Sequence, residues 1–305
     1  MIVLIVGQAG QVGRELQRSF SDFGEIVAVD RESVDLADLD QVREVVRRVR
    51  PDVILNAAAY TSVDRAESEQ DLASAINAEA PGLLAEEALR SNALLVHYST
   101  DYVFDGSKPL PWTEEDAPHP LNVYGASKLA GEEAIRQVGG RYLIFRTSWV
   151  YGPHGKNFLL TMLRLGSERE RLSVVDDQHG APTSSIALAD VTRSVVNQVL
   201  DGRCGAPDAW AGVYHMTCAG STTWCGFAKA IFTGAEHLLH GNAPVVLPIA
   251  SSEYPTPARR PRNSVLSNAR LKQRFGVELP AWEVALGDVL GRLTVESETI
   301  APKSH

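Results

Sequence analysis

The sequence predicts an α/β fold in which a doubly wound parallel sheet is followed by a smaller mixed α/β lobe. In the first 150 residues, short apolar runs alternate with longer helical patterns. After about residue 150 this alternation weakens, and proline and glycine become frequent. Strand–helix alternation is typical of a doubly wound sheet, and the change of rhythm indicates a second structural unit.

Five short segments are the predicted strands of this sheet. They are rich in β-branched and aromatic residues and are apolar nearly throughout, with no regular alternation of apolar and polar positions. This pattern is typical of strands that are buried on both faces of a parallel sheet. In chain order the predicted strands are Ile2–Val6, Ile26–Val29, Val53–Leu55, Leu94–Tyr98 and Tyr142–Arg146.

A segment with a helical pattern separates each predicted strand from the next. Parallel strands need a long crossover connection, usually a helix, so these segments support a parallel sheet. The predicted helices are Gln11–Phe20, Asp38–Val49, Asp71–Ser91 and Val123–Val138.

A glycine-rich loop directly follows the first strand and opens the first helix. Its glycines are Gly7, Gly10 and Gly13, with GxxGxxG spacing. Gly7 permits a tight turn, Gly10 lets backbone amides approach a pyrophosphate, and Gly13 lets the helix pack close to the strand. The loop therefore predicts a Rossmann-like dinucleotide-binding site.

The end of the second strand bears on the choice of cofactor. Asp30 lies where a dinucleotide fingerprint places the acidic residue that accepts hydrogen bonds from the adenosine ribose. Arg31 follows at once and can pair with a 2′-phosphate, although a solvated turn residue is an equal interpretation. The sequence thus leaves both NADPH and NADH open as the cofactor.

These observations give the domain organisation. Residues 1–150 are predicted to form the dinucleotide-binding Rossmann domain. Residues 151–296 are predicted to form mostly a substrate-binding lobe, some segments of which return to the main sheet. Residues 297–305 are expected to be a frayed tail.

Composition narrows the functional class. The chain has 305 residues, 44% hydrophobic and 22% charged, as in a soluble globular protein. Its net charge of −9 argues against nucleic acid or a membrane surface as a partner. The three cysteines form no CxxC pair, and no apolar run reaches about 18 residues. We therefore expect a cytoplasmic protein with reduced thiols and no membrane segment.

Three residues form a candidate catalytic group. Tyr124 and Lys128 are four apart in a helical pattern, so they share one helix face. A neighbouring ammonium is expected to lower the pKa of a phenol, and the pair can then exchange a proton with a carbonyl oxygen. Thr100 follows the fourth strand, where a hydroxyl can hydrogen-bond the same oxygen. The alternative is a serine/threonine turn beside an unrelated amphipathic helix.

Together these residues resemble the extended short-chain dehydrogenase/reductase superfamily, which acts on nucleotide sugars. Longer segments are similar to the dTDP-4-dehydrorhamnose reductase family over nearly the whole chain. Two of them, at 177–183 and 254–261, are typical of this family and not of the superfamily. The matching segments are residues 99–106, 122–125, 145–151, 177–183 and 254–261.

The resemblance implies an oxidoreductase of dTDP-rhamnose biosynthesis. It would reduce the C4 ketone of dTDP-4-dehydro-L-rhamnose to dTDP-L-rhamnose with NADPH or NADH. By position, Tyr124 would be the proton donor to O4, Lys128 would bind the nicotinamide ribose, and Thr100 would hold the sugar oxygen. Asp101 and Trp149 match positions that the family uses to contact substrate.

The resemblance also implies cofactor contacts, which fall on Gly10, Gln11, Val12, Asp30, Asp35, Leu36, Ala59 and Thr61. From the chemistry of the residues themselves, we add Arg259 and Arg260 as candidates for the nucleotide diphosphate. Guanidinium groups fit phosphate oxygens in a bidentate manner. The alternative for these two arginines is a surface ion pair.

Some family members form dimers through magnesium held by carboxylates. Glu15 matches one such position, but Ile186 occupies another, and an isoleucine cannot ligate a hard cation. We therefore expect no metal site, and either a monomer or a homodimer that magnesium does not link.

Two other functions stay open at this point. Another nucleotide-sugar reductase or a 4-epimerase of the same superfamily would use the same tyrosine and lysine. A non-catalytic regulatory subunit, of the kind that binds methionine adenosyltransferase, would bind cofactor without reduction. The intact set of Thr100, Tyr124 and Lys128 argues against the second of these.

Overall fold

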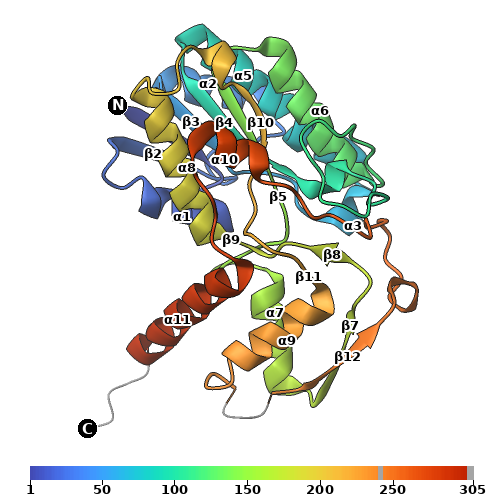
Figure 1. The fold of residues 1–305 in the computed structure, drawn as a ribbon. Helices are drawn as coiled ribbons and strands as arrows, with labels where there is room; N and C mark the ends of the chain where they lie inside the picture. Colours follow the sequence, from blue (N-terminus) through green and yellow to red (C-terminus); the bar gives the residue numbers. More distant parts are fainter. Residues whose placement is uncertain (240–242, 301–305) are drawn as a thin grey trace.

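The computed structural model describes residues 1–239 and 243–300. Its centre is a six-stranded sheet in the order β10-β5-β4-β3-β1-β2, in which every pairing is parallel (Figure 1). This confirms the predicted fold class. The strands are β1 (Ile2–Val6), β2 (Glu25–Val29), β3 (Val53–Asn56), β4 (Leu94–Thr100), β5 (Tyr142–Thr147) and β10 (Gly212–His215).

The sheet is buried on both faces, as the apolar strands predict. Val3 and Ile5 of β1 belong to one hydrophobic cluster, whereas Leu4 and Val6 belong to another on the opposite face. Helices α1 (Gln11–Ser19) and α8 (Ser185–Leu200) cover the first cluster. The second is covered by α2 (Leu39–Val49), α5 (Ala80–Ser91) and α6 (Val123–Val138).

The single helix predicted over 71–91 is wrong in one respect. The chain forms α4 (Gln70–Ser74), a π-helical turn at Ala75–Glu79 and then α5. Within the π turn, Asn77 donates to the Ser127 hydroxyl of α6 at 3.0 Å and accepts from the Tyr60 amide at 2.8 Å. These tertiary hydrogen bonds favour the wider turn, and residue periodicity does not encode them.

The second half of the chain divides between the sheet and a separate lobe. Strand β10 and helix α8 join the sheet and its outer layer, whereas the lobe lies below the sheet in Figure 1. The lobe contains α7 (Phe158–Glu168), α9 (Trp224–Gly234) and the parallel pair of β7 (Arg171–Val175) with β12 (Val245–Ile249). Two further pairs connect it to the sheet, β6 (Val150–Tyr151) with β9 (Thr183–Ser184) and β8 (His179–Gly180) with β11 (Thr222–Thr223).

The remaining elements are short, apart from the last helix. Helix α11 runs to Ile300, so the expected tail from residue 297 begins within a helix, and residues 301–305 lie outside the described residues. No helix among the described residues has the length and apolar character needed to cross a membrane. The other helices are α3 (Val63–Ala66), the 3₁₀ turns Asp101–Val103, Pro207–Ala209 and Ser251–Glu253, α10 (Ala269–Phe275) and α11 (Trp282–Ile300).

Candidate active site

The glycine loop lies between β1 and α1 and has the shape that a pyrophosphate needs. Gly7 has φ +92°, and a Cβ there would lie 2.7 Å from the Ala58 amide nitrogen. A Cβ on Gly13 would lie 2.0 Å from the Gly7 carbonyl oxygen. Gly10 precedes α1 without a side chain, so the first amides of that helix stay open to an anion. The residues present therefore fit a dinucleotide.

A cavity of about 280 Å³, here called the sheet-edge cavity, lies beside this loop at the carboxyl ends of β1, β2 and β3. Asp30 is held at its rim, where one carboxylate oxygen accepts from Gln8 Nε2 at 3.1 Å and the other from the Glu32 amide at 3.1 Å. Arg31 is exposed at the same rim. Seven predicted cofactor residues line the cavity, namely Gly7, Asp30, Arg31, Asp35, Leu36, Ala59 and Thr61.

Two other predicted cofactor residues have structural contacts outside that cavity. Gln11 accepts at its side-chain oxygen from Asn157 Nδ2 at 2.9 Å, which ties α1 to the start of α7. Val12 is partly buried against the hydrophobic cluster that covers one face of the sheet.

Thr100 ends β4, whereas Tyr124 and Lys128 lie one turn apart at the start of α6. Thr100 hydrogen-bonds the Tyr124 phenol, and Lys128 contacts His97 of β4. Asn122 caps α6, because its side-chain oxygen accepts from the Gly125 amide at 2.8 Å. Gly125 packs so closely that a Cβ there would lie 2.2 Å from the Tyr102 carbonyl oxygen. The helix start is therefore fixed against the residues that follow β4.

The pKa of the Tyr124 phenol differs from the value that the sequence predicts. Its pKa is raised to about 12 because burial disfavours the phenolate, and a hydrogen bond with the Thr100 hydroxyl opposes that rise. The sequence predicts instead that Lys128 lowers this pKa. In the structure burial is the largest influence on this pKa, so the phenol keeps its proton more firmly than a free tyrosine.

Lys128 is almost completely buried, at 1% exposure. Its Nζ lies 3.1 Å from Nε2 of His97 in β4. Burial lowers the pKa of Lys128 to about 7, and the Glu132 carboxylate partly opposes this shift. That carboxylate is itself occupied by Arg146 at 2.7 Å and by the Ser99 hydroxyl at 2.5 Å.

The predicted substrate residue Asp101 follows Thr100 in a buried 3₁₀ turn. Burial raises its pKa to about 7, and hydrogen bonds with Ser264 and Thr100 oppose the rise. The carboxyl can therefore be protonated near neutral pH.

Trp149 is held in one orientation at the start of the lobe. Its backbone has φ +47°, in the left-handed region that side chains rarely adopt. Its ring stacks on Trp224 with the centroids 3.5 Å apart and the planes 7° apart. A Cβ on Gly180 would lie 2.4 Å from the Trp149 ring, so only glycine leaves room for it.

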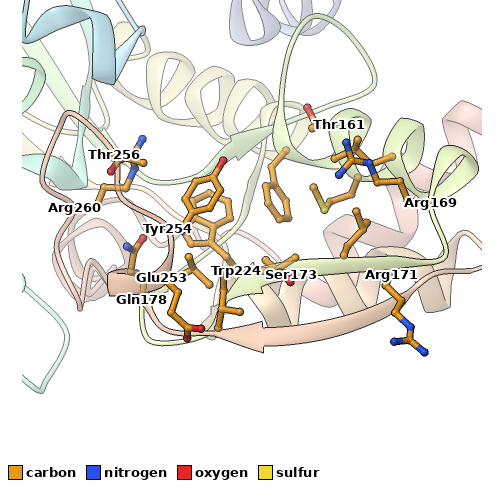
Figure 2. Close-up of a pocket in the computed structure, with 17 residues that line it drawn as sticks. Thr161, Arg169, Arg171, Ser173, Gln178, Trp224, Glu253, Tyr254, Thr256 and Arg260 are labelled. Carbon is orange, nitrogen blue, oxygen red and sulfur yellow. The ribbon is translucent and has the colours of Figure 1, made fainter.

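The lobe contains a larger cavity of about 780 Å³, here called the lobe cavity. Figure 2 shows Gln178, Thr256 and Arg260 at one end and Arg169 and Arg171 at the other. Of its lining residues, the sequence predicts a ligand-binding role only for Arg260, although Gln178, Tyr254 and Thr256 lie in the segments that resemble the family. The lining residues are Phe158, Thr161, Met162, Leu165, Arg169, Arg171, Leu172, Ser173, Val174, Val175, Gln178, Trp224, Ile249, Glu253, Tyr254, Thr256 and Arg260.

The two candidate arginines differ in position. Arg260 lines the lobe cavity and pairs with Asp64 of α3 at 2.8 Å, so it also joins the lobe to the Rossmann half. Arg259 is exposed and does not line this cavity. Its carbonyl accepts from Asn122 Nδ2 at 2.8 Å, which places the segment beside the start of α6.

The two positions considered for magnesium have other partners. Glu15 is buried and pairs with Arg18 at 2.7 Å and with Arg292 at 3.6 Å. Ile186 is a buried core residue. Within the described residues, no three histidine, cysteine or acidic side chains are grouped to hold a metal ion.

Residues 1–295 match the family described as RmlD substrate binding domain. The chain is 49% identical to a dTDP-4-dehydrorhamnose reductase of Burkholderia thailandensis, over 94% of this chain and 97% of that one. It is 45% identical to the enzyme of that name from Escherichia coli K12, over 96% and 98%. A crystal structure of dTDP-4-dehydrorhamnose reductase from Bacillus anthracis in complex with NADP has a TM-score of 0.84 and 38% identity, covering 97% of this chain and 99% of that one.

Proposed function

This chain belongs to the RmlD substrate binding domain family of dTDP-4-dehydrorhamnose reductases, and we propose that it catalyses the reaction of that name. It reduces the C4 ketone of dTDP-4-dehydro-L-rhamnose to dTDP-L-rhamnose with a nicotinamide cofactor. The observation that carries this proposal is the hydrogen bond between Thr100 and the Tyr124 phenol, with Lys128 one turn further along α6, in a chain whose glycine loop fits a dinucleotide.

The proton path follows from the state of Tyr124. A reduced nicotinamide supplies the hydride for C4 when it is bound. Tyr124 donates its phenolic proton to O4, and its raised pKa keeps that proton available at neutral pH. Thr100, which hydrogen-bonds the phenol, is placed to hold the same oxygen. The ammonium form of Lys128 stabilises the phenolate that remains and can bind the nicotinamide ribose.

The two cavities divide the rest of the ligands. The sheet-edge cavity takes the adenosine end of the cofactor, with Asp30 facing the ribose and Arg31 at its rim. The lobe cavity takes the nucleotide end of the substrate, where Arg260 provides a guanidinium for the diphosphate. Asp101 and Trp149 are the proposed contacts for the sugar. The position of Arg259 outside the lobe cavity makes Arg260 the stronger diphosphate candidate of the two.

The direct test supplies purified protein with dTDP-4-dehydro-L-rhamnose and with NADPH or NADH in parallel. We expect stoichiometric loss of cofactor absorbance and formation of dTDP-L-rhamnose. Tightly retained NAD with isomerised sugar and no net cofactor oxidation would identify a 4-epimerase instead. Recovery of a stoichiometric methionine adenosyltransferase without any sugar turnover would identify a regulatory subunit.

The role of Tyr124 has its own test. Tyr124→Phe removes the proton but keeps the ring, so turnover should fall about 10²- to 10⁴-fold. The dissociation constant for NADPH, measured by fluorescence titration, should stay within about twofold. A variant that turns over near the wild-type rate would remove Tyr124 from the mechanism.

Location and assembly remain predictions. We propose a cytoplasmic protein that is a monomer or a homodimer without a magnesium link. Light scattering with and without a chelator measures the oligomeric state and its dependence on metal. A dimer that dissociates on chelation would contradict the absence of a magnesium link.

A further inference from the structure

A buried histidine of the central sheet, His97, contacts Lys128 of the candidate active site. His97 lies in β4, three residues before Thr100, and has no exposed surface. Its Nε2 is 3.1 Å from the Lys128 amine, and its Nδ1 is 3.1 Å from Nδ2 of Asn56 in β3. The imidazole therefore bridges a sheet residue and the lysine of α6.

This position is costly for a polar ring. The neighbouring residues Val96 and Tyr98 lie in the hydrophobic cluster on the other face of the sheet, and an apolar side chain would serve the strand equally well. A buried polar ring must find partners for its nitrogen atoms. Burial and the charge of Lys128 both hold the pKa of His97 well below its ordinary value, so the ring is neutral.

Lys128 has few other partners to hold it. The titratable groups that act on it are Glu132 from α6 and His97 from β4, and Tyr124 lies one helical turn earlier on α6. Glu132 is occupied by Arg146 of β5 and by Ser99, and it acts on Lys128 through its charge. Among the described residues, the contact with His97 is the only hydrogen bond of the Lys128 amine. A lysine side chain is long and flexible, so such an anchor decides where its amine lies.

Asn56 in turn fixes the ring. Its side-chain oxygen accepts from the Ala58 amide at 3.3 Å, so its Nδ2 donates to Nδ1 of His97. The neutral ring then carries its hydrogen on Nε2 and donates it to the neutral Lys128 amine. Both asparagine and histidine lie on adjacent strands, at paired positions of β3 and β4. The chain of contacts therefore runs from β3 through β4 to the amine of Lys128.

We propose that His97 is a positioning residue for the reduction, whose Nε2 edge holds the Lys128 amine next to Tyr124 while Asn56 fixes the imidazole. This inference rests on the proposed function, because it concerns the lysine that serves the reduction. His97 itself touches neither substrate nor cofactor in the proposal. Its effect on turnover passes through Lys128.

Two amide variants separate the two edges of the ring. The glutamine of His97→Gln carries its amide near the position of Nε2, and can still contact Lys128. The asparagine of His97→Asn carries its amide near Nδ1, and can contact only Asn56. We expect kcat of His97→Asn to fall about 10- to 100-fold, because a small displacement of a catalytic group has effects of that size. His97→Gln should recover most of this loss, with KM for the dTDP-sugar unchanged in both.

A second measurement shows whether the effect passes through Lys128. In a Lys128→Met background, His97→Asn should cause no further loss of kcat, because the group that it positions is gone. Thermal unfolding of all variants tests for a purely structural role. Equal loss of kcat in His97→Gln and His97→Asn, or a loss that persists in the Lys128→Met background, would overturn the inference.

The control for the proposed function is the wild-type protein in the same assay. If wild-type protein does not oxidise NADPH with dTDP-4-dehydro-L-rhamnose, the proposed function fails. If wild-type protein is active and His97→Asn is equally active, only the role of His97 fails.

Discussion

The sheet-edge cavity and the lobe cavity are built in different ways. The residues that line the first all lie between 6 and 76, in consecutive strands, loops and helices at one half of the sheet. The second is lined by residues between 158 and 260, which come from α7, β7, α9, β12 and the loop between β12 and α10. One cavity is thus made by local chain geometry, and the other by distant segments that meet.

This difference separates two kinds of sequence signal. A tight turn, a helix start and a strand end leave fixed residue types at fixed spacing, as with Gly7, Gly13 and Asp30. A wall made by two distant strands, such as β7 and β12, requires only that side chains fit in space. The first kind of site is readable from the sequence, whereas the second is not.

The strongest way to break the sheet-edge cavity is Gly13→Ala. A methyl group there meets the Gly7 carbonyl, so the loop must move away from its phosphate-binding shape. We expect the free energy of unfolding to fall by about 1–3 kcal/mol, as in other overpacked sites. NADPH binding, measured by calorimetry, should weaken far more than this loss of stability alone predicts.

A matched control uses a glycine with free space around it. A Cβ on Gly287 of α11 would meet no atom within 4 Å, so Gly287→Ala should keep cofactor binding and stabilise the helix by about 0.5–1 kcal/mol. If Gly13→Ala bound NADPH as the wild type does, the close approach at this loop would have no functional role.

The lobe cavity is tested by Arg260→Met. Losing a charged hydrogen-bond donor to the diphosphate should raise KM for the dTDP-sugar about tenfold, because such bonds contribute about 1.5–3 kcal/mol. The dissociation constant for NADPH should not change. Arg259→Met is the control, since that side chain is exposed and does not line the cavity, and its KM should match the wild type. An equal rise of KM in both variants would mean that the loss of positive charge, and not a contact made by Arg260, causes the effect.

The smallest expected effect concerns Lys128, which lines neither of the two cavities. Its pKa of about 7 in the folded protein is below the ordinary 10.5, so between these values the unfolded chain holds a proton that the folded chain releases. The lysine therefore costs most stability below pH 7, and this cost disappears as pH rises towards 10.5. Lys128→Met should raise Tm of the cofactor-free protein by a few degrees below pH 7, with a gain that shrinks at higher pH.

Calorimetric scans of the wild type and of Lys128→Met, from below pH 7 to above it, measure this difference in Tm. A constant difference in Tm at every pH would mean that the side chain stabilises or destabilises the fold by packing alone.

The sequence by itself determined the parallel sheet, the positions of its first five strands and the glycine loop. These features depend on residues that are close along the chain, because strand burial, turns and helix starts impose their requirements locally. It also indicated Thr100, Tyr124 and Lys128, since their spacing follows from a strand end and one helix face.

Only the tertiary structure decided the remaining features. The π turn at Asn77 depends on a hydrogen bond to another helix, and the high pKa of Tyr124 depends on its burial. In the sequence, His97 is indistinguishable from any other residue of a buried strand, because nothing near it indicates that Lys128 lies against its ring. The lining of the lobe cavity likewise comes from segments far apart in the chain. Long-range packing sets desolvation and contact, and neither quantity is written in the spacing of neighbouring residues.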